Sequence, residues 1–171
     1  MLAPDIRRVF IVANSEQNKW LLDRTRSAAV DLGLTLTIKN ATTLRTAAQS
    51  YRDVLENIDP KHDALWLPLD PNFDESTLRL ILGIAWKNRL VVFSSGPDMA
   101  QRGALFSFYP DYKAIGYHVA ELLEDAPVSK LDTNAIRPTS DIKLAVNLRT
   151  AQHLGLEFNN DVKAKIEVVF K

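Results

Sequence analysis

Two loops of this chain combine carboxylate, amide and aromatic side chains that could bind a small polar ligand. Asp70, Asn72 and Phe73 stand close together, shortly after the apolar run Ala64–Leu67. A carboxylate and an amide in one loop suit the ammonium or hydroxyl groups of such a ligand. The same residues also fit a turn followed by a helix cap, because Asp-Pro and Asn favour turns through local hydrogen bonds. The residue types leave both interpretations open.

The second loop contains Tyr109, Asp111 and Tyr112. An aromatic wall beside a carboxylate could bind the ammonium group of an amino acid by ion pairing and cation–π contact. The alternative is structural: Asp111 caps the helix that follows and the tyrosines line its start.

Residue types that most catalytic and cofactor sites need are missing. There is no Gly-x-Gly-x-x-Gly or Gly-x-x-x-x-Gly-Lys loop to hold phosphates. The three histidines His62, His118 and His153 form no i, i+4 pair, which disfavours a histidine metal site. The absence of cysteine excludes disulfides, cysteine-ligated metals and thiol catalysis. We therefore expect no catalytic residue, no metal and no cofactor.

A phosphoacceptor domain of the response-regulator receiver type is the least favoured alternative. Asp70 and Ser94 follow the third and fourth apolar runs, where a receiver keeps its phosphoacceptor and a hydroxyl residue. A receiver also needs an acidic pair after its first strand and a lysine after its fifth. Here those positions read Ala13-Asn14-Ser15 and Ser107-Phe108-Tyr109. Without metal ligands, phosphoryl transfer lacks its charge neutralisation.

Length and charge narrow the class of protein further. The chain has 171 residues, enough for one domain with a substantial core, and 46% of them are hydrophobic. Lys plus Arg and Asp plus Glu both number 21, so the net charge is zero. A neutral chain lacks the positive surface that nucleic acids attract, and we expect no nucleic-acid partner. No apolar run is long enough to span a membrane, and the residues Met1 to Asp5 do not resemble a signal peptide.

Short apolar runs alternate with amphipathic stretches, which predicts the elements that position these loops. Strands are expected at Arg8–Val12, Leu34–Ile38, Ala64–Leu67, Leu90–Phe93, Ala104–Phe108 and Ile142–Val146, with helices between most of them and a last helix carrying Val162, Ile166 and Val169. This alternation predicts an α/β fold, a three-layer α/β/α sandwich around a mainly parallel sheet. Ligands of such sheets bind at the carboxyl ends of the strands, where the two loops lie.

Several segments resemble, in order, one family of proteins. The run Asp63–Asp70, DALWLPLD, resembles the Asp-Ala-aliphatic-aromatic-aliphatic-Pro-Thr-Asp segment of ABC-transporter substrate-binding proteins of the tryptophan and aromatic amino acid type. Further resemblances to this family are Asn14 (a Tyr-Asn-Pro loop), Leu90–Ser95 (Pro-Val-Phe-x-Ser-Asp), Arg102–Leu105 (Gly-Ala-Leu), Asp111-Tyr112 with Gly116 (Val-Asp-Tyr-Tyr-x-x-Gly) and Lys143–Gly155 (Leu-x-x-Asn-Leu-x-x-Ala-x-x-Leu-Gly).

The resemblance implies one lobe of a type I periplasmic binding protein. Two similar lobes joined by a hinge close around a ligand in that design, and these motifs match only the second lobe. The single domain 1–171 would then comprise the core of the lobe at 8–108, a hinge-crossing helix at 109–125, a connection at 126–141, and a returning strand with C-terminal helices at 142–171. The apolar positions Ile115, Val119 and Leu122 would lack their usual partner, so this helix would fold back onto its own sheet or form a homodimer contact.

The resulting hypothesis is a non-catalytic solute-binding lobe of an ABC-type uptake system, with an amino-acid-like ligand, aromatic amino acids included, and an ABC permease as partner. Its location would be extracytoplasmic, with the cytoplasm as the alternative because the chain shows no export signal. A single-lobe sensor or interaction module that homodimerises is the alternative function. Asp70 or Asp111 would accept from the ligand's ammonium group. The predicted ligand-binding residues are Asn14, Ser15, Asp70, Asn72, Phe73, Ser94, Ser95, Tyr109, Asp111 and Tyr112.

Overall fold

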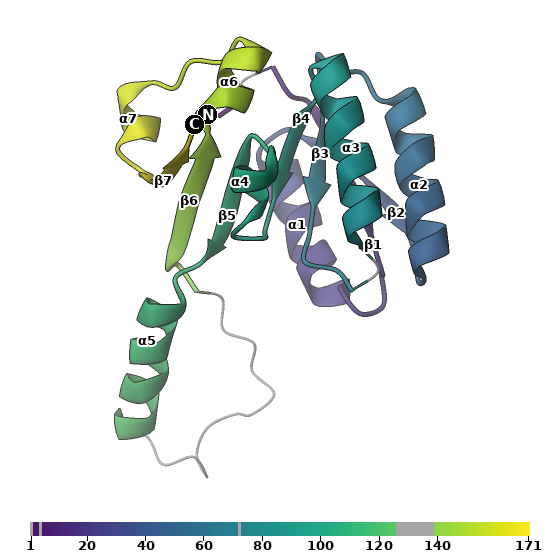
Figure 1. Cartoon of the computed structure of the whole chain (residues 1–171). Coiled ribbons are helices and arrows are strands. Elements are labelled where there is room, and N and C mark those ends of the chain that lie inside the picture. The colour runs from purple at the N-terminus through teal and green to yellow at the C-terminus, as the bar shows by residue number, and fades with distance from the viewer. Residues whose placement is uncertain (1, 4, 72, 126–138) are drawn as a thin grey trace.

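A seven-stranded sheet in the order β2-β1-β3-β4-β5-β6-β7 forms the middle layer of the computed structural model (Figure 1). Residues 2–3, 5–71, 73–125 and 139–171 are described. Strands β1 to β5 run parallel, whereas β6 pairs antiparallel to β5 and parallel to β7. The strands are β1 Arg8–Ala13, β2 Thr35–Asn40, β3 Asp63–Leu67, β4 Val91–Ser94, β5 Phe106–Pro110, β6 Ile142–Asn147 and β7 Ile166–Phe170. The predicted α/β fold with a mainly parallel sheet is confirmed.

Helices cover both faces of the sheet. The helices are α1 Lys19–Asp31, α2 Leu44–Asn57, α3 Glu75–Asn88, α4 Met99–Arg102, α5 Tyr112–Asp125, α6 Leu148–Leu154 and α7 Asn160–Lys163. Phe10 and Val12 of β1 pack with residues of α2 and α3, whereas Ile11 and Ala13 pack with Leu22 of α1. Because successive side chains of a strand point to opposite faces, a strand covered on both faces is apolar throughout. None of the described helices combines the length and apolar character needed to cross a membrane.

Side-chain hydrogen bonds cap the beginnings of four helices. The side chains of Thr43, Asp74, Asn147 and Asn159 each accept from a backbone N–H in the first turn of a helix. Helix α1 differs, because Asn18 precedes it without a side-chain hydrogen bond to its first turn.

The predicted helix at the C-terminus is wrong over most of its length. Only α7 is helical, and Ile166–Phe170 instead form β7 beside β6. The spacing of Val162, Ile166 and Val169 fits a helix, but the run is also rich in β-branched residues, which favour a strand when an open sheet edge is available.

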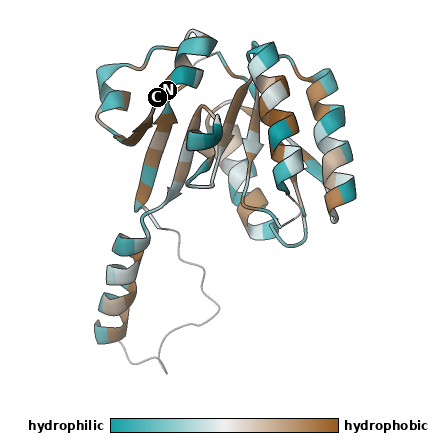
Figure 2. Cartoon of the chain, in the orientation of Figure 1, coloured by the Kyte–Doolittle hydropathy of each residue, from teal (hydrophilic) through white to brown (hydrophobic). Residues whose placement is uncertain are grey.

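Helix α5 stands away from the sheet (Figure 1). It leaves the end of β5, and β6 begins beside that same end. Figure 2 shows hydrophobic positions along α5 as well as in the strands. The fold-back of α5 onto its own sheet, one of two expected arrangements, is therefore not what the structure shows.

Candidate functional site

The predicted ligand residues come from the loops at the strand ends from which α5 extends (Figure 1). This end of the sheet is called the binding edge below. The carboxyl ends of β1, β3, β4 and β5 reach this edge, as does the amino end of β6. Because parallel strands end side by side, loops far apart in the sequence become neighbours here.

Asp70 links the loops after β1 and β3. Its Oδ2 accepts from the backbone N–H of Asn14 at 3.0 Å and from Nδ2 of Asn18 at 3.1 Å. The Asn14 side chain is buried, and its Oδ1 accepts from the backbone N–H groups of Glu16 and Gln17. Three polar side chains therefore hold the turn before α1 against the loop after β3.

The loops after β1 and β2 are joined in the same way. The backbone N–H of Ser15 donates to Oδ1 of Asn40 at 2.9 Å. Ser15 is half-buried and Asn40 is exposed, so both stand near the surface of this edge. The edge thus offers mainly amide and hydroxyl groups around one carboxylate.

The two serines after β4 have hydrogen-bond partners within the fold. Ser94 is buried, its Oγ donates to the carbonyl of Leu67 at 2.7 Å, and that same oxygen accepts from the Gly96 N–H at 3.0 Å. Ser95 Oγ accepts from Nε1 of Trp66 at 3.0 Å. Ser94 thus shapes the turn, whereas Ser95 joins that turn to an aromatic side chain of β3.

Phe73 packs on Tyr51 of α2, with ring centroids 5.6 Å apart and an edge-on orientation. The Tyr51 hydroxyl is buried and lies 3.4 Å from the carbonyl of Val12. Burial raises the pKa of Tyr51, and the charge of Asp70 raises it further. A neutral phenol therefore lies beneath the Asp70 loop.

A separate group lies where β5 leads into α5. Asp111 accepts from the backbone N–H groups of Lys113 and Ala114, and Nζ of Lys143 lies 3.1 Å from its Oδ2. The Lys143 ammonium is the main reason that the pKa of Asp111 is lowered. Tyr109 is half-buried and Tyr112 is 64% exposed. Asp111 therefore carries out its structural role as a cap, and its charge is already paired. The remaining predicted residue, Asn72, lies outside the described residues.

This edge has no concentration of metal ligands in the part of the chain that the structure describes, where no three His, Cys, Asp or Glu residues stand together as a metal site would require. Its chemistry is that of hydrogen bonding: one carboxylate, several amides and hydroxyls, and nearby aromatic rings. Such a set can recognise a small polar molecule through hydrogen bonds.

Sequence reasoning missed Asn18 and Lys143. Asn18 is four residues after Asn14, a spacing that a turn or helix start can bring together, so a signal for it was present. Lys143 faces Asp111 because β6 pairs antiparallel to β5, with Tyr109 opposite Lys143. That pairing depends on the path of the chain and has no local sequence signal.

Comparison with known proteins places the chain in a family. The family model "ABC transporter substrate binding protein" matches residues 1–169. Curated proteins gave no significant match by sequence.

Solved structures share the fold. One is a conserved domain protein from Vibrio cholerae (21% identity, TM-score 0.72, 98% of this chain and 56% of that one). Another is CD0873 from Clostridium difficile in its ligand-free, open form, a substrate binding protein with adhesive properties (22%, 0.69, 99% and 56%). A third is the ABC domain from Streptococcus pneumonia in complex with L-Trp (19%, 0.73, 99% and 57%).

The chain thus spans little more than half the length of each of these structures. The family model matches nearly all residues of the chain. The chain belongs to the ABC transporter substrate binding protein family.

Proposed function

We propose that this chain is one lobe of a non-catalytic solute-binding protein, and that its ligand is a small amino-acid-like molecule. The observation that carries the proposal is the family match over residues 1–169, taken with the polar loops that gather at one edge of the sheet. The share of each neighbour that the chain covers supports the assignment of a single lobe.

The ligand class is argued from the chemistry of the edge. Asp70 is the carboxylate that would meet a ligand ammonium, because it lies where the loops after β1 and β3 meet. Asn14, Ser15 and Ser95 would add neutral hydrogen bonds, with Phe73, Tyr109 and Tyr112 as apolar walls. An aromatic amino acid fits this set, and the neighbour from Streptococcus pneumonia holds L-Trp.

The proposed setting follows from the family. A solute-binding lobe of this kind would work outside the cytoplasm and deliver its ligand to an ABC permease. Within that lobe, 8–108 would form the core and 109–125 the hinge-crossing helix.

A thermal-shift screen with amino acids tests the proposal. A ligand that binds only the folded state stabilises it by about 2.7 kcal/mol at a hundredfold excess over its Kd. We expect L-Trp or a related amino acid to raise the melting temperature of the chain. Asp70→Asn keeps an oxygen to accept from the Asn14 N–H but removes the charge, so it should abolish the shift while leaving the unliganded protein folded. The absence of a shift with every amino acid would contradict the proposal.

A second candidate function is an interaction module that homodimerises through α5. Val119 and Leu123 are each 50% exposed, and Ile115 and Leu122 are only half-buried. These residues share one face of the helix, since they recur three and four positions apart. An apolar face of this size on a projecting helix favours a protein partner.

A further inference from the structure

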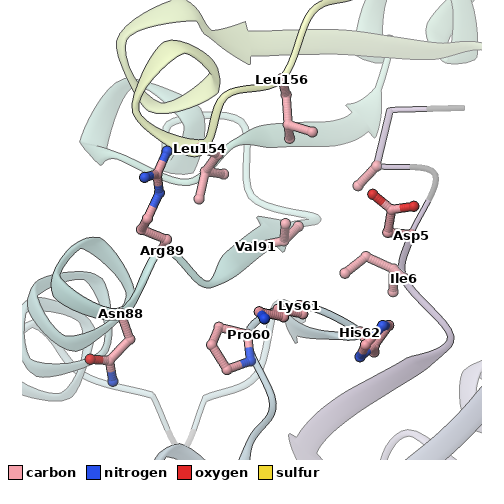
Figure 3. Close-up of a pocket in the computed structure, with 11 residues that line it drawn as sticks. Asp5, Ile6, Pro60, Lys61, His62, Asn88, Arg89, Val91, Leu154 and Leu156 are labelled. Carbon is pink, nitrogen blue, oxygen red and sulfur yellow. The ribbon is translucent and has the colours of Figure 1, made fainter.

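A cavity of about 510 Å³ lies at the amino ends of the strands, opposite the edge proposed to bind the solute (Figure 3). Its walls come from four segments: the residues before β1, the loop before β3, the loop from α3 to β4, and the residues at and after the end of α6. A volume of this size is within the range of small-molecule sites. The proposed solute-binding function makes no use of it.

The inner walls of this cavity are apolar. Ile6 and Val91 are buried, and Leu154 and Leu156 close the opposite wall (Figure 3). An apolar surface of this kind binds the hydrocarbon part of a ligand, because burial removes that part from water.

The polar groups of the cavity carry an excess of positive charge. Lys61 and Arg89 line it, and neither forms an ion pair with another described residue. The Asp59 carboxylate near Lys61 is already bound, since one of its oxygens accepts from the Lys61 backbone N–H and the other meets Nδ1 of His62. Asp5 is the one acidic residue of the lining.

Arg89 occupies a backbone position that ordinarily favours glycine. It is the C-cap of α3 with φ of 56°, and among the described residues no other non-glycine residue has a positive φ. One guanidinium nitrogen donates to the carbonyl of His153 at 2.7 Å, which fixes the side chain at the cavity wall. The other N–H groups of its five-donor fork remain for a further acceptor. A side chain kept in a strained conformation at a cavity points to a role that glycine could not fill.

We propose that this cavity binds an organic carboxylate with an apolar body, with Arg89 pairing its negative end and Lys61, on another wall of the cavity (Figure 3), adding to the positive potential. The apolar chain would then lie along Val91, Leu154 and Leu156. This site is separate from the solute-binding edge, so the two proposals succeed or fail independently.

Octanoate is the probe that tests the proposal, with octylammonium as the control of opposite charge. Titration of the chain carrying labelled leucine and valine methyl groups should give saturable NMR shifts at Leu154 and Leu156 with octanoate only. Val9 and Leu34 line an adjoining apolar cavity on the sheet face, which shares Ile6 and Val91 with this one, and they should not shift. Equal binding of both probes, shifts confined to Val9 and Leu34, or no saturable shift would each overturn the proposal.

Two variants test the charges directly. Arg89→Gly removes the guanidinium but suits the left-handed backbone, so its urea midpoint should not fall while its Kd for octanoate rises about tenfold or more. Lys61→Gln should also weaken binding. Lys87→Gln, the same change on a neighbouring exposed lysine that does not line the cavity, should leave the Kd unchanged. A Kd that is equal in all four proteins would overturn the assignment.

Discussion

Asp63 is the one charged side chain in the buried core of the described residues, and its partners explain how it is accommodated. Its two oxygens accept from Arg8 at 2.9 and 2.6 Å, and Oδ2 also accepts from the Asp59 N–H at 2.8 Å. A buried carboxylate is tolerated when its lone pairs are satisfied in this way. Asp63 therefore joins β1, β3 and the loop before β3.

We expect Asp63→Asn to lower the free energy of unfolding by about 2 kcal/mol, because it weakens charge-assisted hydrogen bonds inside the protein. Asp23→Asn is the matched control: Asp23 contacts Lys19 and Arg26 but is exposed, so its replacement should change the stability much less. Urea denaturation measures both. A similar loss of unfolding free energy in the two variants would show that the burial of Asp63 does not strengthen its hydrogen bonds.

Asp111 leads to a prediction about pH. Its pKa is lowered in the folded protein, chiefly by Lys143. The stabilisation from this pair is therefore complete above the ordinary carboxyl pKa of about 3.9. It is lost as the pH falls through the lower pKa that Asp111 has in the folded protein. Asp111→Asn keeps an oxygen to cap α5 but removes the charge. Its urea midpoint should lie below that of the unchanged protein near neutral pH and converge with it in acid. A constant difference at every pH would contradict the assignment.

At the scale of the elements, two glycines of the same fold should respond in opposite directions to alanine. Gly83 is within α3, is exposed, and a Cβ there would meet nothing within 4 Å. Gly155 ends α6 with φ of 73°. We expect Gly83→Ala to stabilise by roughly 0.5–1 kcal/mol and Gly155→Ala to destabilise by about 1 kcal/mol. Thermal unfolding of the two variants is the measurement, and a shift of the same sign in both would be the contrary result.

Elements were predictable wherever one pattern dominated. β1, β3 and β4 are continuous apolar runs covered on both faces, and the sequence shows them clearly. The segment 162–170 carries a helical and a strand pattern at once, and only the open edge beside β6 decides between them. Asp70 and Asn14 were identified because each follows a strand, whereas Lys143 required knowledge of which strand lies beside β5. Residues that stand next to a recognisable strand could therefore be predicted, whereas contacts that depend on the order of the strands could not.

At the scale of the whole molecule, α5 is the element on which we expect the oligomeric state of the chain in solution to depend. Val119 lies on its apolar face, and Tyr117, 62% exposed, is two residues away and so points to the opposite side. If α5 forms the dimer contact, Val119→Glu should shift sedimentation towards the monomer and Tyr117→Glu should not. An unchanged protein that sediments as a monomer at every concentration would contradict the dimer.

The hydrogen bond from Trp66 to Ser95 has a practical consequence. An indole emits at a wavelength that depends on its surroundings, and this one is tied to the turn proposed to contact the solute. Trp20 and Trp86, the other two indoles, are about 40% exposed and belong to α1 and α3. Replacing both by Phe would leave a single emitter at the proposed binding edge. The protein thus contains a native optical reporter, and binding of a non-fluorescent ligand could be followed without attaching a dye.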